Sequence, residues 1–182
     1  MEKNLESERV YLRRFRVDDY NDVYEYLSLE EVVRYEPYSP MSLEECKKET
    51  IQRSNSASFY AIILKSEEKL IGNIYFNQKQ PYKYMTYELG YVLNPKYQLQ
   101  GYATEAVHII LKHGFTKFNV HRVIANCNQN NLRSIRLLER VGMRRETDSK
   151  QDVFFNYAIN GDPNWLDSYM FAILSDEYLS KG

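Results

Sequence analysis

Gln98-Leu99-Gln100-Gly101-Tyr102-Ala103 separates an alternating, aromatic-rich run at residues 87–93 from a segment with apolar side chains at helical spacing. This order predicts a strand, a turn of small residues and a helix. The N–H groups of a helix's first turn have no acceptor within the helix, and the positive end of the helix dipole lies behind them. Gly101 lets the backbone approach a ligand, and Ala103 keeps the next turn narrow. The stretch therefore predicts an anion site suited to a pyrophosphate.

Further segments occur in a recognisable order around this turn, which itself continues as Thr104-Glu105-Ala106. They are Glu88-Leu89-Gly90-Tyr91, Asn131-Leu132-Arg133-Ser134, Leu138-Glu139-Arg140-Val141-Gly142-Met143 and Trp165-x-Asp167-x-Tyr169. With these segments the chain resembles the GNAT N-acetyltransferase superfamily and, within it, the ribosomal-protein-alanine acetyltransferase (Rim-type) branch. The resemblance begins at Val10-Tyr11-Leu12-Arg13 and reaches the last expected strand. It is specific for the superfamily and far less specific for any substrate.

The composition limits the class of protein. The length of 182 residues suits one domain with a sizeable core, and we expect a single domain over residues 1–182. Lys and Arg total 24 against 25 Asp and Glu, so no basic excess indicates nucleic acid. No apolar run predicts a signal peptide or a membrane span. Two well-separated cysteines, Cys46 and Cys127, fit a reducing compartment, so we expect a cytoplasmic protein that binds neither nucleic acid nor membrane.

Hydrophobic periodicity divides the chain into strands and helices. Strands are expected at residues 10–15, 59–64, 70–76, 87–93, 122–127, 153–157 and 168–174. Helices are expected after an Asp18 or Asp19 cap, after a capping box of Ser42 and Glu45, at residues 101–118, and at residues 131–141 before Gly142. This order predicts a mixed α/β fold. The resemblance implies the GNAT fold, a mostly antiparallel, splayed central sheet flanked by helices.

The resemblance implies acetyl-CoA as the acyl donor and cosubstrate. Its pyrophosphate is expected at the turn, on Gln98, Leu99, Gln100, Gly101, Tyr102, Ala103 and Thr104. Its pantetheine amides are expected to pair with the exposed edge of the strand that ends at Leu93. Pairing within the sheet must stop near Pro95, because proline cannot donate to a ladder. The family has a bulge in this strand, which is expected near Gly90 and Leu93. An ordinary edge strand that meets a loop is the alternative.

Three residues are expected to carry the chemistry that the resemblance implies. Asn131 lies at a helix start and suits an N-cap, and in Rim-type relatives an Asn at this place binds pantetheine. Ser134, one turn later, is the proposed general acid in such relatives, although many GNAT enzymes use a Tyr. Glu88 shares a strand face with Gly90 and Val92 and is the candidate base, directly or through a water. The alternatives are an ordinary helix-surface serine and a carboxylate that pairs with a neighbouring basic strand.

The acceptor amine decides how much a base must do. At pH 7 a lysine or polyamine nitrogen loses its proton at a cost of roughly 4–5 kcal/mol, whereas an α-amine costs about 1 kcal/mol. In the family fold, the loops Tyr35-Glu36-Pro37-Tyr38 and Gln80-Pro81-Tyr82-Lys83-Tyr84 would flank the cleft, where aromatic rings suit a cation. The same tyrosines could instead pack over the sheet.

The sequence thus predicts an N-acetyltransferase that moves the acetyl group of acetyl-CoA directly to a primary amine, without an acyl-enzyme. The candidate acceptors, in falling order, are a protein N-terminal α-amine, a polyamine, and an aminoglycoside or other small amine. A CoA-binding sensor or scaffold without turnover is the hypothesis from another class. The three histidines show no spacing typical of a metal site, so no metal is predicted. The resemblance is compatible with a homodimer.

Overall fold

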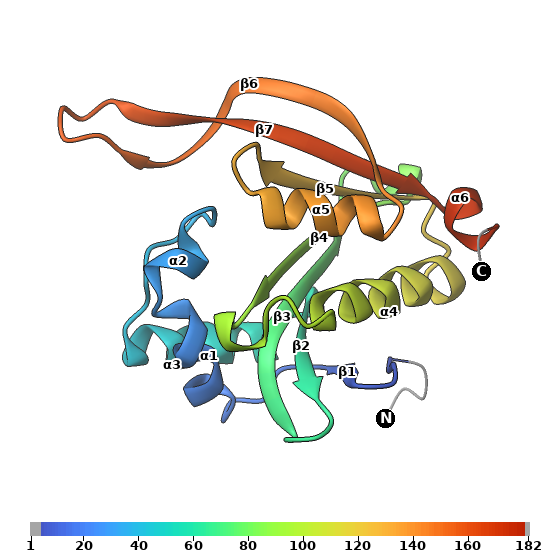
Figure 1. Cartoon of the computed structure of the whole chain (residues 1–182), viewed down its shortest axis with the longest axis horizontal. Helices are drawn as coiled ribbons and strands as arrows, with labels where there is room; N and C mark the ends of the chain where they lie inside the picture. The colour runs from blue at the N-terminus through green and yellow to red at the C-terminus, as the bar shows by residue number, and fades with distance from the viewer. Residues whose placement is uncertain (1–4, 181–182) are drawn as a thin grey trace.

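Seven strands form one sheet in the computed structural model of the chain, which describes residues 5–180 (Figure 1). In chain order they are β1 Val10–Arg13, β2 Phe59–Leu64, β3 Lys69–Gln78, β4 Thr86–Leu93, β5 Arg122–Asn128, β6 Arg144–Tyr157 and β7 Pro163–Leu174. The order across the sheet is β1-β2-β3-β4-β5-β7-β6, and every neighbouring pair is antiparallel except β4 and β5. The mixed α/β, mostly antiparallel fold expected from the sequence is confirmed.

β4 and β5 separate soon after they begin. Their parallel pairing covers three steps, of which the last joins Glu88 to Ile124. β4 continues to Leu93 and β5 to Asn128, but within residues 5–180 the two strands do not pair beyond this point. The central sheet is therefore splayed, as expected.

The bulge expected near Gly90 and Leu93 is not found in the ladder between β3 and β4. Within the described residues, β4 keeps one register against β3 from Tyr87 to Leu93. A register shift lies instead between β2 and β3, at Ile62 and Ile63. The prediction was wrong because the divergence from β5 opens the edge of β4 without an inserted residue.

Helices cover both faces of the sheet (Figure 1). On one face lie α4 Tyr102–Lys117 and α5 Leu132–Arg140, and on the other lie α1 Tyr20–Leu27, α2 Glu30–Val33 and α3 Leu43–Ser54. The short turns η1 Tyr82–Tyr84 and η2 Pro95–Tyr97 flank β4, and α6 Ser175–Leu179 follows β7. None of the helices within residues 5–180 is long and apolar enough to cross a bilayer.

Two short α-helices and half of one strand were not expected from the sequence. α2 and α6 have four and five residues, so each is too short for helical periodicity to reveal it. The first half of β6 is polar and largely exposed, which removes the alternation that predicts a strand. Together, β6 and β7 continue as a two-stranded arm, residues 149–167, whose far end projects from the sheet (Figure 1).

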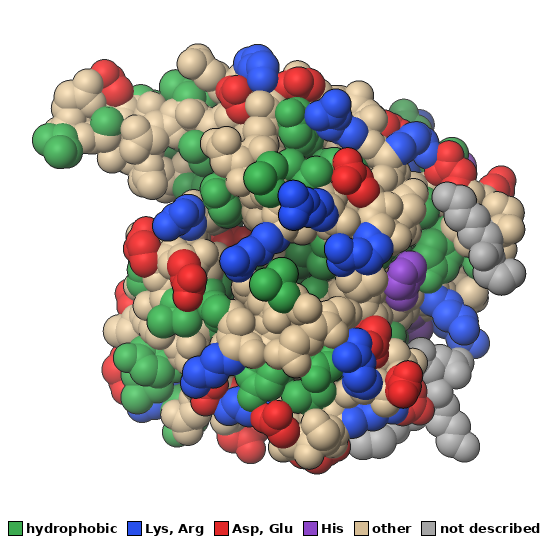
Figure 2. All heavy atoms as spheres, in the orientation of Figure 1, with side chains coloured by type: hydrophobic (Ala, Val, Ile, Leu, Met, Phe, Trp, Pro, Cys, Tyr) green, Lys and Arg blue, Asp and Glu red, His purple; other side chains and the backbone are tan. Residues whose placement is uncertain are grey.

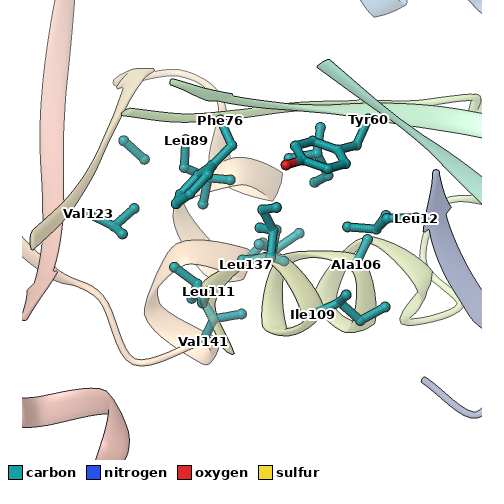
Figure 3. Close-up of a cluster of buried hydrophobic side chains, with 14 of the residues drawn as sticks. Leu12, Tyr60, Phe76, Leu89, Ala106, Ile109, Leu111, Val123, Leu137 and Val141 are labelled. Carbon is teal, nitrogen blue, oxygen red and sulfur yellow. The ribbon is translucent and has the colours of Figure 1, made fainter. Parts of the chain in front are cut away.

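Two hydrophobic cores, one on each face, show which way the side chains of β4 point. The larger core joins α4 and α5 to the sheet and includes Leu89 and Leu93, with Tyr91 packed against it (Figure 3). The smaller core joins α1 and α3 to the sheet and includes Val92. Successive side chains of a strand point to opposite faces. Glu88 therefore lies on the α1–α3 face of the sheet, and Tyr91 lies on the α4/α5 face.

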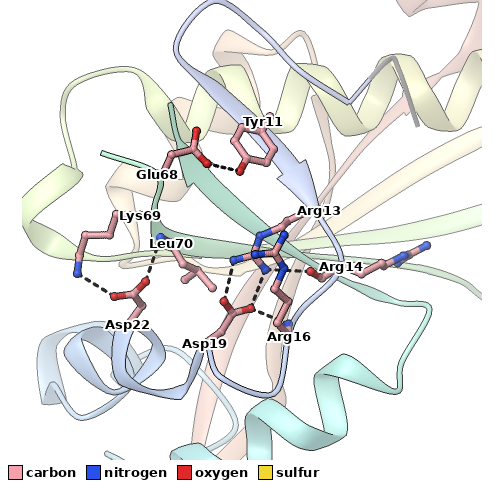
Figure 4. A network of polar contacts seen from close by, with 9 residues as sticks. All are labelled: Tyr11, Arg13, Arg14, Arg16, Asp19, Asp22, Glu68, Lys69 and Leu70. Atoms are coloured by element: carbon pink, nitrogen blue, oxygen red, sulfur yellow. Dashed lines mark hydrogen bonds and ion pairs between the residues drawn. The ribbon is translucent and has the colours of Figure 1, made fainter. Parts of the chain in front are cut away.

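Polar contacts hold α1 against β1 and β3 (Figure 4). The Asp19 carboxylate accepts two hydrogen bonds from the Arg13 guanidinium, at 2.8 and 2.7 Å, and one from the N–H of Arg16 at 2.7 Å. Lys69 donates to Asp22 at 2.8 Å. Asp19 occupies the N-cap position of α1, as expected, but it makes no capping hydrogen bond because its oxygens already bind these two arginines.

The ends of α3 and α5 are as the sequence predicted. Ser42 Oγ accepts from the N–H of Glu45 at 3.3 Å, and the Glu45 carboxylate accepts from the N–H of Ser42 at 2.8 Å. After α5, Gly142 has a φ of 90°, and its N–H donates to the carbonyl of Glu139. The next N–H donates to the carbonyl of Leu138, which completes a Schellman motif. These ends fix where the chain turns back toward the sheet.

Asn73 of β3 is a buried acceptor on which the α1–α3 side depends. Its Oδ1 accepts from the Tyr26 hydroxyl and from the Arg53 guanidinium, both at 2.9 Å, and the residue is 3% exposed. We expect Asn73→Ala to lower the free energy of unfolding by about 2–4 kcal/mol in urea, because two buried donors lose their acceptor. Asn77→Ala, on the same strand and face, removes one half-buried bond to Ser58 and should cost less than about 1.5 kcal/mol. Equal losses in the two variants would contradict this assignment.

Candidate active site

Where β4 and β5 diverge, a cleft of about 510 Å³ opens through the sheet. Its walls come from β4, β5, α5, the loop between α2 and α3, and the arm. On the α4/α5 face the lining includes Tyr91, Cys127 and Ser134, and on the α1–α3 face it includes Glu36 and Glu88. Within residues 5–180, no three His, Cys, Asp or Glu side chains are grouped so that they could hold a metal ion. The α4/α5 face of the cleft thus carries the hydroxyls of Tyr91 and Ser134, whereas its carboxylates lie on the α1–α3 face.

The turn before α4 has the backbone geometry of an anion site. Gly101 is the N-cap of α4 with a φ of 89°, and it has no side chain that could cap the first turn. The N–H groups of Tyr102, Ala103 and Thr104 therefore have no acceptor within the helix. Leu99 also has a positive φ, of 62°, and its side chain is exposed. The turn presents backbone N–H groups and the positive end of α4 to solvent.

The glutamine side chains brace this turn. Gln98 Nε2 donates to the carbonyl of Leu93 at 3.0 Å, and Gln100 Nε2 donates to the carbonyl of Lys96 at 3.2 Å. Both side chains are therefore bound to the protein's own backbone, and the N–H groups of the turn are left to meet an anion. Leu93 is buried in the larger core, so only its backbone can contribute to the edge of β4.

Two arginines of α5 lie against the turn, and sequence reasoning missed their role. Arg133 donates to Gln98 Oε1 at 2.6 Å, and Arg140 donates to Thr104 Oγ1 at 3.2 Å. Figure 2 shows Lys and Arg side chains gathered over α5 and the start of α4. The signal was available, because arginines seven residues apart lie on one face of a helix. Their charges add to the attraction of the turn for phosphate.

Ser134 forms a pair of hydroxyls with Tyr91 on the α4/α5 face of the cleft. Tyr91 Oη and Ser134 Oγ are 2.8 Å apart. Burial raises the pKa of Tyr91 far above its usual range, so this hydroxyl stays protonated at neutral pH. Asn131 Oδ1 accepts from the N–H of Ser134 at 3.1 Å, which confirms Asn131 as the N-cap of α5. Tyr91 is a second candidate for the acid role, and only the packing of α5 against β4 reveals it.

Glu88 lies in the cleft but already has partners. Its oxygens accept from Lys79 Nζ at 2.7 Å and from Asn126 Nδ2 at 3.0 Å. The pairing with a neighbouring basic residue, which the sequence left open as the alternative, is therefore present.

Glu36, on the loop between α2 and α3, is the functional candidate that sequence reasoning did not single out. It is half-buried in the lining of the cleft. Burial raises the pKa of Glu36 to about 7, although the charge of Arg53 and the hydroxyl of Tyr38 lower it. No ion pair to Glu36 is found within residues 5–180. The only signal in the sequence was its place in an aromatic loop.

Of the two loops expected beside the acceptor, one lies at the cleft. Tyr35-Glu36-Pro37-Tyr38 lines it. The loop at residues 80–84 does not, and this expectation was wrong. Lys83 and Tyr84 line a separate hollow of about 520 Å³ with Met85, Thr86, His121 and Arg122. The reason is that this loop enters β4 where β4 is still paired with β5, whereas the cleft opens farther along the strand.

Comparison with known families agrees with this geometry. Residues 9–144 match the family model described as the acetyltransferase (GNAT) domain. This range contains the turn, both splayed strands and the Tyr91–Ser134 pair. The chain belongs to the GNAT acetyltransferase family. It is an acetyltransferase, and the acyl donor of this family is acetyl-CoA.

The relatives of this GNAT enzyme extend over nearly the whole chain. The uncharacterized N-acetyltransferase YnaD of Bacillus subtilis (strain 168) is 38% identical over 179 residues, which cover 96% of this chain and 99% of the relative. The crystal structure of a GNAT family acetyltransferase from Bacillus anthracis has a TM-score of 0.85 at 35% identity, and the match covers 94% of this chain and 98% of that one.

A Rim-type relative is more distant. The ribosomal protein uS5-alanine N-acetyltransferase of Escherichia coli (strain K12) is 25% identical over 126 residues, which cover 69% of this chain and 62% of the relative. The superfamily expected from the sequence is thus confirmed, while the branch within it stays a prediction.

Because the pKa of Glu36 is raised, we expect the free energy of unfolding of this acetyltransferase to depend on pH. A carboxyl with a raised pKa in the fold stabilises the protein while protonated, and this stability is lost as pH rises from about 4.5 through about 7. We expect the free energy of unfolding of Glu36→Gln to exceed that of the wild type by about 1–3 kcal/mol at pH 8 and to be nearly the same at pH 4.5. Urea unfolding at both pH values measures this. Glu31→Gln, on the exposed surface of α2, is the control and should change neither value; no gain for Glu36→Gln at pH 8 would contradict the prediction.

Proposed function

We propose that this GNAT enzyme transfers the acetyl group of acetyl-CoA directly to a primary amine bound on the α1–α3 face of the cleft. The divergence of β4 and β5 carries the proposal, because it opens one cleft with the Tyr91–Ser134 hydroxyl pair at one face and the carboxylates at the other. A donor that enters from the α4/α5 face meets an amine that enters from the opposite face. No covalent intermediate on the protein is needed for this geometry.

The donor half would supply contacts for the pyrophosphate, the pantetheine amides and the thioester of acetyl-CoA. The pyrophosphate would lie on the N–H groups at residues 99–104, with Arg133 and Arg140 as charged neighbours. The pantetheine amides would continue the sheet along the edge of β4 that β5 leaves, as an added strand does. Asn131 lines the cleft beside this edge, and its amide N–H₂ group remains after its Oδ1 caps α5. This path would lead the thioester to the Tyr91–Ser134 pair.

The chemical step joins the amine nitrogen to the thioester carbonyl carbon and breaks the carbon–sulfur bond. Ser134, hydrogen-bonded to Tyr91, would donate a proton to the departing thiolate, and the pair would be restored from solvent. The proton lost by the amine would pass to a carboxylate on the α1–α3 face. Glu88, held by Lys79 and Asn126, would orient the amine or take the proton through a water.

For the acceptor we propose, in falling order, a protein N-terminal α-amine, a polyamine and another small amine. The α-amine is first because it costs only about 1 kcal/mol to deprotonate at pH 7, which suits a site whose Glu88 is already paired. The distant likeness to the ribosomal protein uS5-alanine N-acetyltransferase supports the same order. CoA release measured with acetyl-CoA and a panel of these amines tests the proposal. A CoA-binding sensor would bind acetyl-CoA and release no CoA with any of them.

Acetyl-CoA should stabilise the protein through the turn. At about 100 times its dissociation constant we expect roughly 2.7 kcal/mol, or about 5–11 °C in Tm. Gly101→Ala should lose most of this shift, since its Cβ would occupy the approach to the backbone and lie 3.0 Å from Arg9 Nη2. Gly161→Ala is the matched control, because Gly161 has a φ of 85°, close to the 89° of Gly101, with nothing within 4 Å of its Cβ. Equal shifts in the two variants would show that the turn does not bind the cosubstrate.

The hydroxyl pair should affect turnover more than binding. We expect Ser134→Ala and Tyr91→Phe each to lower kcat by about 10–100-fold, at the low end of general acid catalysis because a thiolate leaves readily. The Tm shift with acetyl-CoA should persist in both variants. Tyr84→Phe, an exposed tyrosine outside the cleft, is the control and should keep full activity. Full activity in Ser134→Ala and Tyr91→Phe would remove both residues from the mechanism.

A further inference from the structure

The charges in the cleft leave one carboxylate unpaired. Three glutamates line it: Glu36, Glu49 and Glu88. Glu49 accepts from Arg53 at 2.7 Å, and Glu88 accepts from Lys79 at 2.7 Å. Glu36 has no ion pair in the part of the chain that the structure describes. Its charge is thus the one available to a cation that enters the cleft.

Aromatic side chains surround this carboxylate. Tyr35 and Tyr38 flank it on its own loop, and Phe155 reaches the cleft from the arm. Figure 2 shows the arm overhanging a notch at this side of the molecule. Aromatic faces favour a cation and the apolar groups next to it. The surroundings of Glu36 therefore suit an ammonium group attached to an apolar skeleton.

The titratable and charged groups that line the cleft with Glu36 come from several elements. They are Tyr35 and Tyr38 on the same loop, Glu49 and Arg53 on α3, Tyr75 on β3, Glu88 and Tyr91 on β4, and Cys127 on β5. The arm contributes Phe155, which does not titrate. Burial raises the pKa of Tyr38 and Tyr91 above their usual range and that of Cys127 to about 11. None of these three changes its charge between pH 5 and 9, whereas Glu36 does.

On the basis of the proposed function, we infer that Glu36 binds the acceptor's ammonium group and takes its proton, and that the acceptor carries a single positive charge next to an apolar or aromatic skeleton. One unpaired carboxylate matches one cation. A second ammonium group of a polyamine would find the other two glutamates already paired, and it would face the charge of buried Arg53. Proton transfer from R–NH₃⁺ to the carboxylate gives R–NH₂ and the carboxylic acid. The neutral amine then attacks the thioester carbonyl carbon, the carbon–sulfur bond breaks, and the thiolate takes a proton from Ser134. The second proton on the amine nitrogen passes to solvent, which reprotonates Ser134, and the Glu36 acid returns its proton to water.

Glu88, the candidate base expected from the sequence, does not take the proton in this inference. Glu88 keeps its ion pair with Lys79 and so positions the amine, while Glu36 handles the proton. A pKa near the working pH is what a general base requires. The raised pKa of Glu36 follows from its partial burial without a cation. The same feature that costs stability at pH 8 therefore prepares the site for its substrate.

The experiment is a pH profile of kcat/KM from pH 5.5 to 9.5 with 2-phenylethylamine as the monocation and spermidine as the polycation. We expect the wild type to lose activity below about pH 7 and to prefer 2-phenylethylamine by at least about 10-fold. In Glu36→Gln, kcat/KM at pH 8 should fall by about 100-fold, and the loss of activity below about pH 7 should disappear from the pH profile. Glu36→Asp should keep the loss of activity at low pH, with a smaller fall in kcat/KM. Glu31→Gln should match the wild type, and the acetyl-CoA shift in Tm should persist in every variant.

Two results would overturn the inference while leaving the proposed function intact. The first is a wild type that acetylates amines while Glu36→Gln still shows the fall in kcat/KM below about pH 7. The same conclusion would follow if that fall were lost in Glu88→Gln and not in Glu36→Gln. The second is spermidine used as well as 2-phenylethylamine. A wild type that binds acetyl-CoA and acetylates neither these probes nor a peptide α-amine would instead overturn the proposed function, and the inference with it.

Discussion

The structure depends on the point at which β4 and β5 stop pairing. Past Glu88 and Ile124, each strand continues with one side of its backbone unpaired by the other. Backbone groups in such a position need water or a ligand, because leaving them buried without partners is costly. The splay persists because the strands are held from outside, by one core with α4 and α5 and another with α1 and α3. Both strands contribute side chains to the larger core, and β4 also contributes Val92 to the smaller one, so their packing does not depend on a ladder between them.

Polar groups are distributed over this cleft by the alternation of strand side chains. Glu88 and Tyr91 are three residues apart on β4, so the Tyr91 hydroxyl lies on the α4/α5 face and the Glu88 carboxylate on the α1–α3 face. The ion pairs of Arg53 and Lys79 then neutralise two of the three carboxylates. Glu36 has no ion pair among residues 5–180, and burial of its carboxyl raises its pKa to about 7.

In the turn before α4, residues 98–104, side chains and backbone groups differ in what they bind. The side chains of Gln98 and Gln100 bind carbonyl groups of the protein itself, and Gly101 takes a backbone conformation that L residues rarely adopt. Arg133 and Arg140 reach the turn from a helix that lies some thirty residues later in the chain. An anion at this place therefore contacts groups from two helices that only the fold brings together.

The sequence by itself determined the local features of this protein. The periods of apolar residues gave most strands and helices, the Ser42 box and Gly142 gave two helix ends, and the order Glu88, Gly101, Asn131, Ser134 indicated the family. These features depend on neighbours a few residues apart, which is why periodicity and capping rules reveal them. Only the tertiary structure decided that Lys79 pairs with Glu88, that Tyr91 meets Ser134 and that Glu36 lines the cleft with no ion pair to any residue from 5 to 180. Burial and charge pairing arise from segments distant in sequence, and no local pattern encodes which of them meet.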